Sequence, residues 1–156
     1  MRTINDWLDA YGVSHKNSTN KLIHWICIPA IMFSLFGLLY SIPFLMPKSI
    51  LMNWAAIFLA LTLVFYLRLS ISIFLGFVFI GGAMLWGNHL LAQSLAQTGT
   101  SLALVSLAIF VVAWIGQFIG HKIEGKKPSF FEDLQFLLIG PAWLLLFIYR
   151  KVGIPY

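Results

Sequence analysis

Apolar residues of this chain gather into five long stretches, which short polar or charged segments separate. The stretches predict transmembrane helices over about 20–39, 50–67, 70–95 and 101–121, and a shorter apolar helix over about 134–149. A helix that crosses a hydrocarbon core of about 30 Å needs roughly 20 apolar residues, and the first four stretches are close to that length or longer. The expected fold class is therefore all-α, a polytopic helical membrane protein with four transmembrane helices.

The fifth stretch is short, and Gly140 and Pro141 interrupt it. Its length suits an interfacial helix, a re-entrant helix or a fifth crossing. Lysine and arginine favour cytoplasmic loops. If the amino end is cytoplasmic and the fifth stretch does not cross, every basic residue except Lys48 lies inside. We therefore expect four crossings followed by an interfacial or re-entrant segment, with five crossings as the alternative.

A short amphipathic helix is expected ahead of the first crossing, because apolar side chains recur there at helical spacing. These side chains are Ile4, Trp7, Leu8 and Tyr11, and Gly12 would end the helix. From Asn17 to Asn20 the chain carries only residues that cap helices. We expect one integral-membrane domain over 1–156, with an interfacial segment over 1–19 and a helical bundle over 20–156.

Composition supports a membrane protein and excludes an ordinary soluble domain. Hydrophobic residues make up 60% of the chain and charged residues only 10%, whereas soluble domains carry about 25% charge. The net charge of +5 is spread among loops beside the crossings. We therefore expect membrane lipid as a partner and no nucleic acid. Cys27 is the single cysteine, which excludes an intrachain disulfide. The host membrane would be the inner membrane in a bacterium or the endoplasmic reticulum in a eukaryote.

Three of the four histidines are expected at one membrane face. His15 and His24 precede or open the first crossing, and His121 ends the fourth, so an even number of crossings returns it to the same side. Neutral imidazoles bind Fe, Zn, Cu or Ni, and the three rings predict a mononuclear metal site at the cytoplasmic face. Histidines near an interface also serve as hydrogen-bonded anchors, so the hypothesis depends on their convergence. His89 lies about 28 Å along the third helix, near the opposite face, and is a lesser candidate ligand.

Amides and one acid accompany these histidines. Trp114, Gln117, His121 and Glu124 follow i, i+3, i+7 and i+10, and so share a helix face. Candidates for orienting the ligand rings are Asn17, Asn20, Gln117 and Glu124. A site of two histidines and a carboxylate would need Glu124, whereas a three-histidine set is simpler.

Other residues are candidates for binding an acidic, lipid-like substrate. Lys21, Lys126 and Lys127 could hold a carboxylate or an acidic headgroup, although a solvated basic loop explains the last two as well. Trp25, Trp114 and Trp143 could line an acyl-chain cavity or anchor helices at the interface. The residues alone leave three functional classes open: a metal-dependent oxygenase, a zinc-dependent lipid hydrolase, and a non-catalytic metal carrier or assembly factor.

Two motifs carry a resemblance to a known family. The first comprises His15, Asn17, Asn20, Ile23 and His24, followed by Ile28 and Pro29. The second comprises Gln117, Phe118, Gly120, His121 and Glu124, followed by Lys126, Lys127 and Pro128. In this order and placement they resemble the small membrane family of the fungal 2-hydroxy-palmitic acid dioxygenase, over nearly the whole chain.

The resemblance implies an Fe(II)-dependent dioxygenase that shortens 2-hydroxy long-chain fatty acids by one carbon, in α-oxidation, without 2-oxoglutarate. The substrates would be a 2-hydroxy fatty acid and O₂. By the same resemblance, His15, His24 and His121 would hold the iron and be the catalytic residues. His89 lies outside both motifs, and the resemblance assigns it no role.

Overall fold

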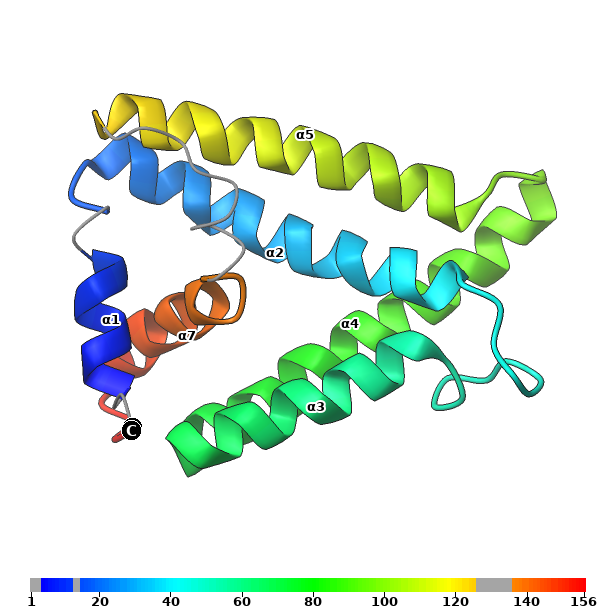
Figure 1. Cartoon of the computed structure of the whole chain (residues 1–156), viewed down its shortest axis with the longest axis horizontal. Helices are drawn as coiled ribbons and strands as arrows, with labels where there is room; N and C mark the ends of the chain where they lie inside the picture. The colour runs from blue at the N-terminus through cyan, green and yellow to red at the C-terminus, as the bar shows by residue number, and fades with distance from the viewer. Residues whose placement is uncertain (1–3, 13–14, 126–135) are drawn as a thin grey trace.

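The structure, a computed structural model, describes residues 4–12, 15–125 and 136–156. Within these ranges every regular element is a helix, as the hydrophobic pattern predicts. The helices are α1 (Ile4–Gly12), α2 (Ser18–Ser41), α3 (Trp54–Leu69), α4 (Ile71–Thr98), α5 (Leu102–Ile123) and α7 (Ile139–Val152), shown in Figure 1. The predicted interfacial helix corresponds to α1, and it ends at Gly12 as expected.

Capping asparagines fix where two of the helices, α2 and α3, begin. The Asn17 side chain accepts hydrogen bonds from the backbone N–H groups of Thr19 and Asn20 and starts α2. Asn53 caps α3 in the same way, so this helix begins about four residues later than predicted. Ser101 occupies the N-cap position of α5, but its side chain makes no capping hydrogen bond.

Three described helices are long and apolar enough to cross a membrane: α2 with 24 residues, α4 with 28 and α5 with 22. The second predicted crossing, α3, is apolar but has only 16 residues. The count of four crossings is therefore not confirmed. With 14 residues α7 is shorter still, below the roughly 20 that a straight crossing requires.

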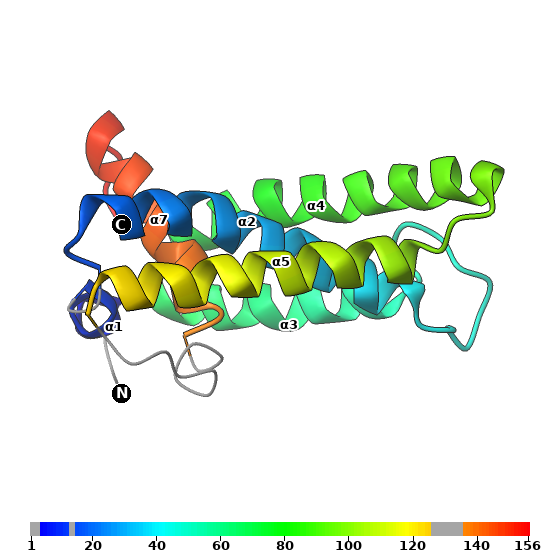
Figure 2. The same cartoon turned by 90° about the horizontal axis from the view of Figure 1, so that it is seen from above.

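The long helices run side by side, and α5 lies antiparallel to α2 along most of its length (Figures 1 and 2). Glycines on α5 allow this close approach. A Cβ at Gly116 would lie 2.6 Å from the Cys27 sulfur on α2. Antiparallel packing brings the start of α2 and the end of α5 to the same end of the bundle.

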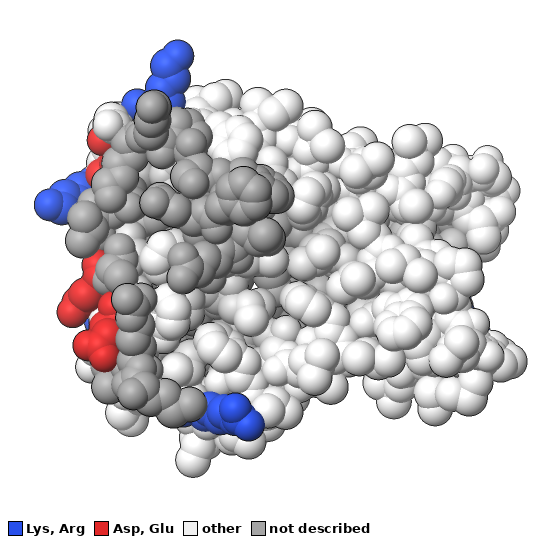
Figure 3. Space-filling model, viewed as in Figure 1, with Lys and Arg blue, Asp and Glu red and all other residues white. Residues whose placement is uncertain are grey.

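At that end α1 and α7 pack against each other and close the bundle (Figure 1). Hydrogen bonds fix α7 to the α3–α4 pair, because the Tyr66 hydroxyl donates to the Leu138 carbonyl at 2.6 Å and the Tyr149 hydroxyl donates to the Ser72 carbonyl at 2.9 Å. The charged side chains visible in Figure 3 gather over this end of the molecule. The predicted histidine site lies at the same end.

Candidate metal centre

Three histidines from the two ends of the chain meet at one point. His15 precedes α2, His24 lies in its second turn, and His121 lies in the last turn of α5. One ring nitrogen from each lies within 4.8 Å of the other two. The exposed fractions of the side chains are only 4%, 1% and 6%, respectively. The predicted convergence of these residues at one end of the bundle is thus present in the structure.

Backbone carbonyls set the tautomer of two of these rings. His15 Nδ1 lies 2.6 Å from the Tyr11 carbonyl oxygen, and His24 Nδ1 lies 2.9 Å from the Asn20 carbonyl oxygen. A carbonyl can only accept a hydrogen bond, so each Nδ1 carries the proton and donates it. The lone pair of each neutral ring is then on Nε2, the arrangement typical of metal-binding histidines.

Glu124 joins the end of α5 to the start of α2. Its carboxylate accepts hydrogen bonds from the Lys16 N–H at 2.7 Å, the Asn17 N–H at 2.9 Å and the Asn20 side-chain amide at 2.9 Å. Both oxygens are engaged, which argues against Glu124 as the carboxylate of a two-histidine site. It instead fixes the backbone next to His15 relative to the helix that carries His121.

These contacts also determine the protonation of Glu124. Desolvation by burial raises the pKa of Glu124. The two backbone N–H donors, the Asn20 amide and the charge that His15 can carry lower this pKa, and their combined effect is larger than that of desolvation. The net pKa lies below the ordinary value of 4.5. The carboxylate is therefore ionised at neutral pH and acts purely as an acceptor.

The donor set fits a single transition-metal ion. Three evenly spaced nitrogens bound to one ion at about 2.1 Å lie at most about 3.6 Å apart, and the donor nitrogens lie within 4.8 Å of one another, so each ring would need to move inward by less than about 1 Å. Three neutral nitrogens leave coordination positions for substrate, and they suit iron, zinc, copper or nickel. The geometry is compatible with one ion held by these three residues, and it leaves the metal open.

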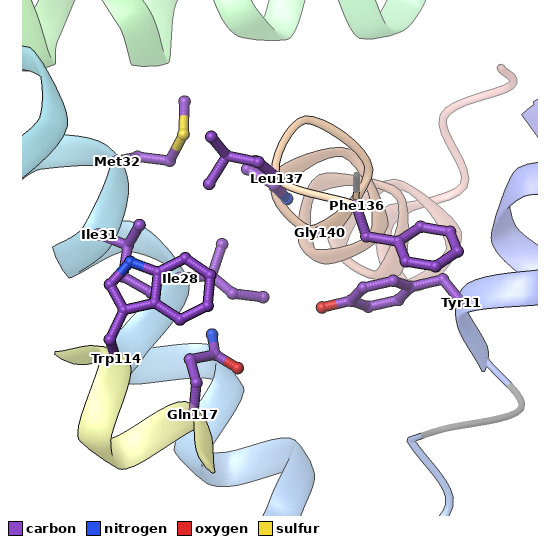
Figure 4. A pocket seen from close by; sticks show the side chains of 10 residues that line it. Tyr11, Ile28, Ile31, Met32, Trp114, Gln117, Phe136, Leu137 and Gly140 are labelled. Carbon is purple, nitrogen blue, oxygen red and sulfur yellow. The ribbon is translucent and has the colours of Figure 1, made fainter. Parts of the chain in front are cut away.

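A pocket of about 30 Å³ lies near the three histidines, although none of them is among its lining residues: Tyr11, whose ring stacks on His15, and Gln117, one helical turn before His121, line it. We call it the site pocket; its lining residues are Tyr11, Ile28, Ile31, Met32, Trp114, Gln117, Phe136, Leu137, Gly140 and Pro141. Figure 4 shows the Tyr11 hydroxyl and the Gln117 amide directed into it from opposite sides, with Met32 and Leu137 farther along. The pocket therefore has a polar end, formed by Tyr11 and Gln117, and an apolar end at Met32 and Leu137.

Aromatic rings enclose His15. The Tyr11 ring stacks on it at a centroid distance of 4.0 Å, and the Trp143 ring lies at 5.5 Å. Sequence reasoning missed Tyr11 as a site residue, although it lies four residues before His15, about one helical turn away. Trp143, considered for an acyl cavity, lies against His15 itself.

A groove of about 310 Å³ lies between α1 and α7, beside Trp143, and Lys16 and Arg150 are among its lining residues. Neither cation was singled out from the sequence, although Lys16 is adjacent to His15. Among the lysines that the sequence did suggest for substrate binding, Lys21 does not line the site pocket. Lys126 and Lys127 lie outside the described residues.

His89 lies apart from the other three histidines. Its Nδ1 is 2.7 Å from the Tyr40 hydroxyl and its Nε2 is 3.1 Å from the Gln93 side-chain amide. Tyr40 is sixteen residues after His24 on α2, which is about 24 Å along the helix. This position agrees with the expectation that His89 lies near the opposite end of the bundle.

We expect Gly120→Ala to weaken the site without removing a ligand. A Cβ at Gly120 would collide with the Asn20 amide oxygen and lie 3.3 Å from His24 Cε1. Displacing His24 should lower metal affinity about 10- to 100-fold, as loss of ligand-orienting contacts does, and overpacking should cost about 1–3 kcal/mol of stability. Metal titration and thermal unfolding of the purified variant measure both effects.

Gly82→Ala is the matched control, because a Cβ at Gly82 on α4 meets nothing within 4 Å. Its metal affinity should equal that of the wild type. Equal affinities in the Gly120→Ala and Gly82→Ala proteins would contradict the tight packing of His24 against α5.

Comparison with known proteins adds an activity to this geometry. The family model described as 2-hydroxy-palmitic acid dioxygenase Mpo1-like matches residues 1–152. The chain is 28% identical to the 2-hydroxy-palmitic acid dioxygenase MPO1 of Saccharomyces cerevisiae over 151 residues, which cover 94% of this chain and 79% of the yeast protein. No solved structure matches the chain.

Proposed function

Since this chain belongs to the Mpo1-like family of 2-hydroxy-palmitic acid dioxygenases, we propose that it oxidises long-chain 2-hydroxy fatty acids with O₂, using Fe(II) held by His15, His24 and His121. One observation carries the proposal beyond membership of the family. The three buried imidazoles converge, and Tyr11, whose ring stacks on His15, lines a neighbouring pocket that has polar groups at one end and apolar side chains at the other. An amphiphilic acid has this polarity.

The proposed reaction shortens the fatty acid by one carbon. A 2-hydroxy acid and one O₂ give the acid one carbon shorter, CO₂ and water, and this equation balances in atoms. The substrate supplies all four electrons that reduce O₂, so no 2-oxoglutarate or other reductant is needed. Iron would supply the redox chemistry that brings O₂ and the chelating 2-hydroxy acid to react.

The polar residues of the site pocket would orient the acid group. The Tyr11 hydroxyl and the Gln117 amide both point into the pocket (Figure 4), and each can donate a hydrogen bond to a carboxylate or a 2-hydroxyl oxygen. The rings of Tyr11 and Trp143 cover His15, which would keep bulk water from the reacting carbon. Water exclusion strengthens such hydrogen bonds in the site.

The groove between α1 and α7 offers an approach for the acid from the membrane surface. Lys16 and Arg150 can attract a carboxylate, and Leu146 and Phe147 in the same groove can contact the start of an acyl chain. We place this face in the cytoplasm, because the described basic residues are more numerous at this end.

The test combines metal analysis with turnover. Protein purified anaerobically should bind one Fe(II) per chain, and incubation with 2-hydroxypalmitate and O₂ should yield pentadecanoic acid and CO₂ in equal amounts. Turnover that continues with zinc and without O₂ would replace this proposal with a hydrolase. Absence of both metal binding and turnover would favour the non-catalytic class.

A further inference from the structure

A second cavity, of about 160 Å³, lies deeper in the bundle between α2, α3, α4 and α7. We call it the apolar cavity, because Thr62 is the only polar side chain among its lining residues. It shares Ile28, Met32 and Pro141 with the site pocket. The two spaces are therefore neighbours on either side of these three side chains, and a tail that occupies both would have to displace at least one of them.

The length of this path matches a long acyl tail. Along α2 it runs from His24 at the metal centre to Phe36, the last α2 residue that lines the apolar cavity. Twelve residues of helix span about 18 Å at 1.5 Å per residue. An extended alkyl chain advances about 1.25 Å per carbon, given bonds of about 1.52 Å and near-tetrahedral angles. About fourteen carbons fill 18 Å, which equals the part of a sixteen-carbon acid beyond C2.

Large side chains close the end of the apolar cavity that is farther from the histidines. Phe36 is only 1% exposed, and its ring meets the Phe58 ring edge-on at 5.8 Å. Leu59 and Met84 line the same end, and Leu59 packs over Gly81, where a Cβ would collide with it. This end is part of a hydrophobic cluster that includes Phe36, with Leu59 and Met84 packed against it, so it cannot lengthen without repacking.

We propose that the apolar cavity holds the acyl tail of the substrate and that Phe36 ends it, which makes Phe36 the residue that limits chain length. The proposal rests on the proposed function for the identity of the acid group at the histidines. The tail itself is recognised only by its length and its lack of polar atoms. Each further buried methylene should tighten binding about fourfold until the tail reaches Phe36.

The experiment measures binding separately from turnover. Saturated 2-hydroxy acids of 12 to 20 carbons are titrated against metal-free protein without oxygen, and the shift in unfolding temperature gives the affinity of each. Wild-type affinity should stop rising near sixteen carbons. Phe36→Ala should move this limit to eighteen carbons or more, and Met84→Trp should move it to fourteen or fewer.

Phe79→Ala on α4 is the matched control, since Phe79 is 77% exposed on the outside of the bundle, and its length profile should equal that of the wild type. If Phe36→Ala does not fold, the chain-length limit of Met84→Trp alone tests the proposal. Unchanged limits in the folded cavity variants would overturn the proposal and assign the cavity to a membrane lipid or to none. Shifted limits in a protein that oxidises nothing would support the cavity assignment and refute the proposed function instead.

Discussion

His24→Ala is expected to abolish both iron binding and oxidation. His24 is 1% exposed, its Nδ1 donates to the Asn20 carbonyl, and its ring centroid lies 4.3 Å from that of His15 and 5.0 Å from that of His121. Groups that only orient ligands contribute about 10- to 100-fold to metal affinity, so loss of a ligand should cost more than 100-fold. The readouts are bound iron per chain and pentadecanoic acid formed from 2-hydroxypalmitate.

His89→Ala is the control, because this histidine bonds to Tyr40 and Gln93 away from the metal centre. It should retain one iron per chain and nearly wild-type turnover. Fe(II) should also raise the unfolding temperature of His89→Ala but not that of His24→Ala, since a metal stabilises only a folded state that binds it. Full iron occupancy in His24→Ala would remove this histidine from the ligand set.

The helical elements and the convergence of the histidines followed from the sequence because both depend on one-dimensional patterns. Long apolar stretches specify helices, and an even number of helices from His24 to His121, each opposite in direction to the one before, returns the chain to one end. The structure reaches that geometry through α3, whose 16 residues are fewer than predicted. Asn53 caps this helix and holds the preceding residues in a turn, a choice that hydrophobicity alone does not reveal.

The surroundings of the metal site depend on contacts between segments that are far apart in sequence. Trp143 reaches His15 only because α7 packs against α1. The sequence predicts that Glu124 shares a helix face with His121, but its hydrogen bonds come from three donors that lie more than a hundred residues earlier in the chain. Spacing can place a residue on a helix face, whereas such partners depend on how the helices pack.

Glu124→Gln is expected to weaken the metal centre although it removes no ligand. The carboxylate has only acceptor atoms, and it faces the Lys16 N–H, the Asn17 N–H and the Asn20 amide. Glutamine replaces one oxygen with a donor group, so at least one of the three hydrogen bonds becomes a donor–donor contact. The segment that carries His15 should then separate from α5, and Fe(II) affinity should fall about 10- to 100-fold.

Acidification should have the same effect as the substitution, which provides an independent check. The pKa of Glu124 is lower in the folded protein than its ordinary value of 4.5, so its contribution to stability is complete above that value and disappears as the pH falls through the lower, folded value. In metal-free protein the unfolding temperatures of the wild type and Glu124→Gln should therefore differ at neutral pH and converge in acid. Asp9→Asn, which neutralises an exposed carboxylate on α1, should show no comparable difference at neutral pH. If the difference in unfolding temperature between the wild type and Glu124→Gln does not change with pH, the charge of Glu124 does not hold the segment that carries His15 against α5.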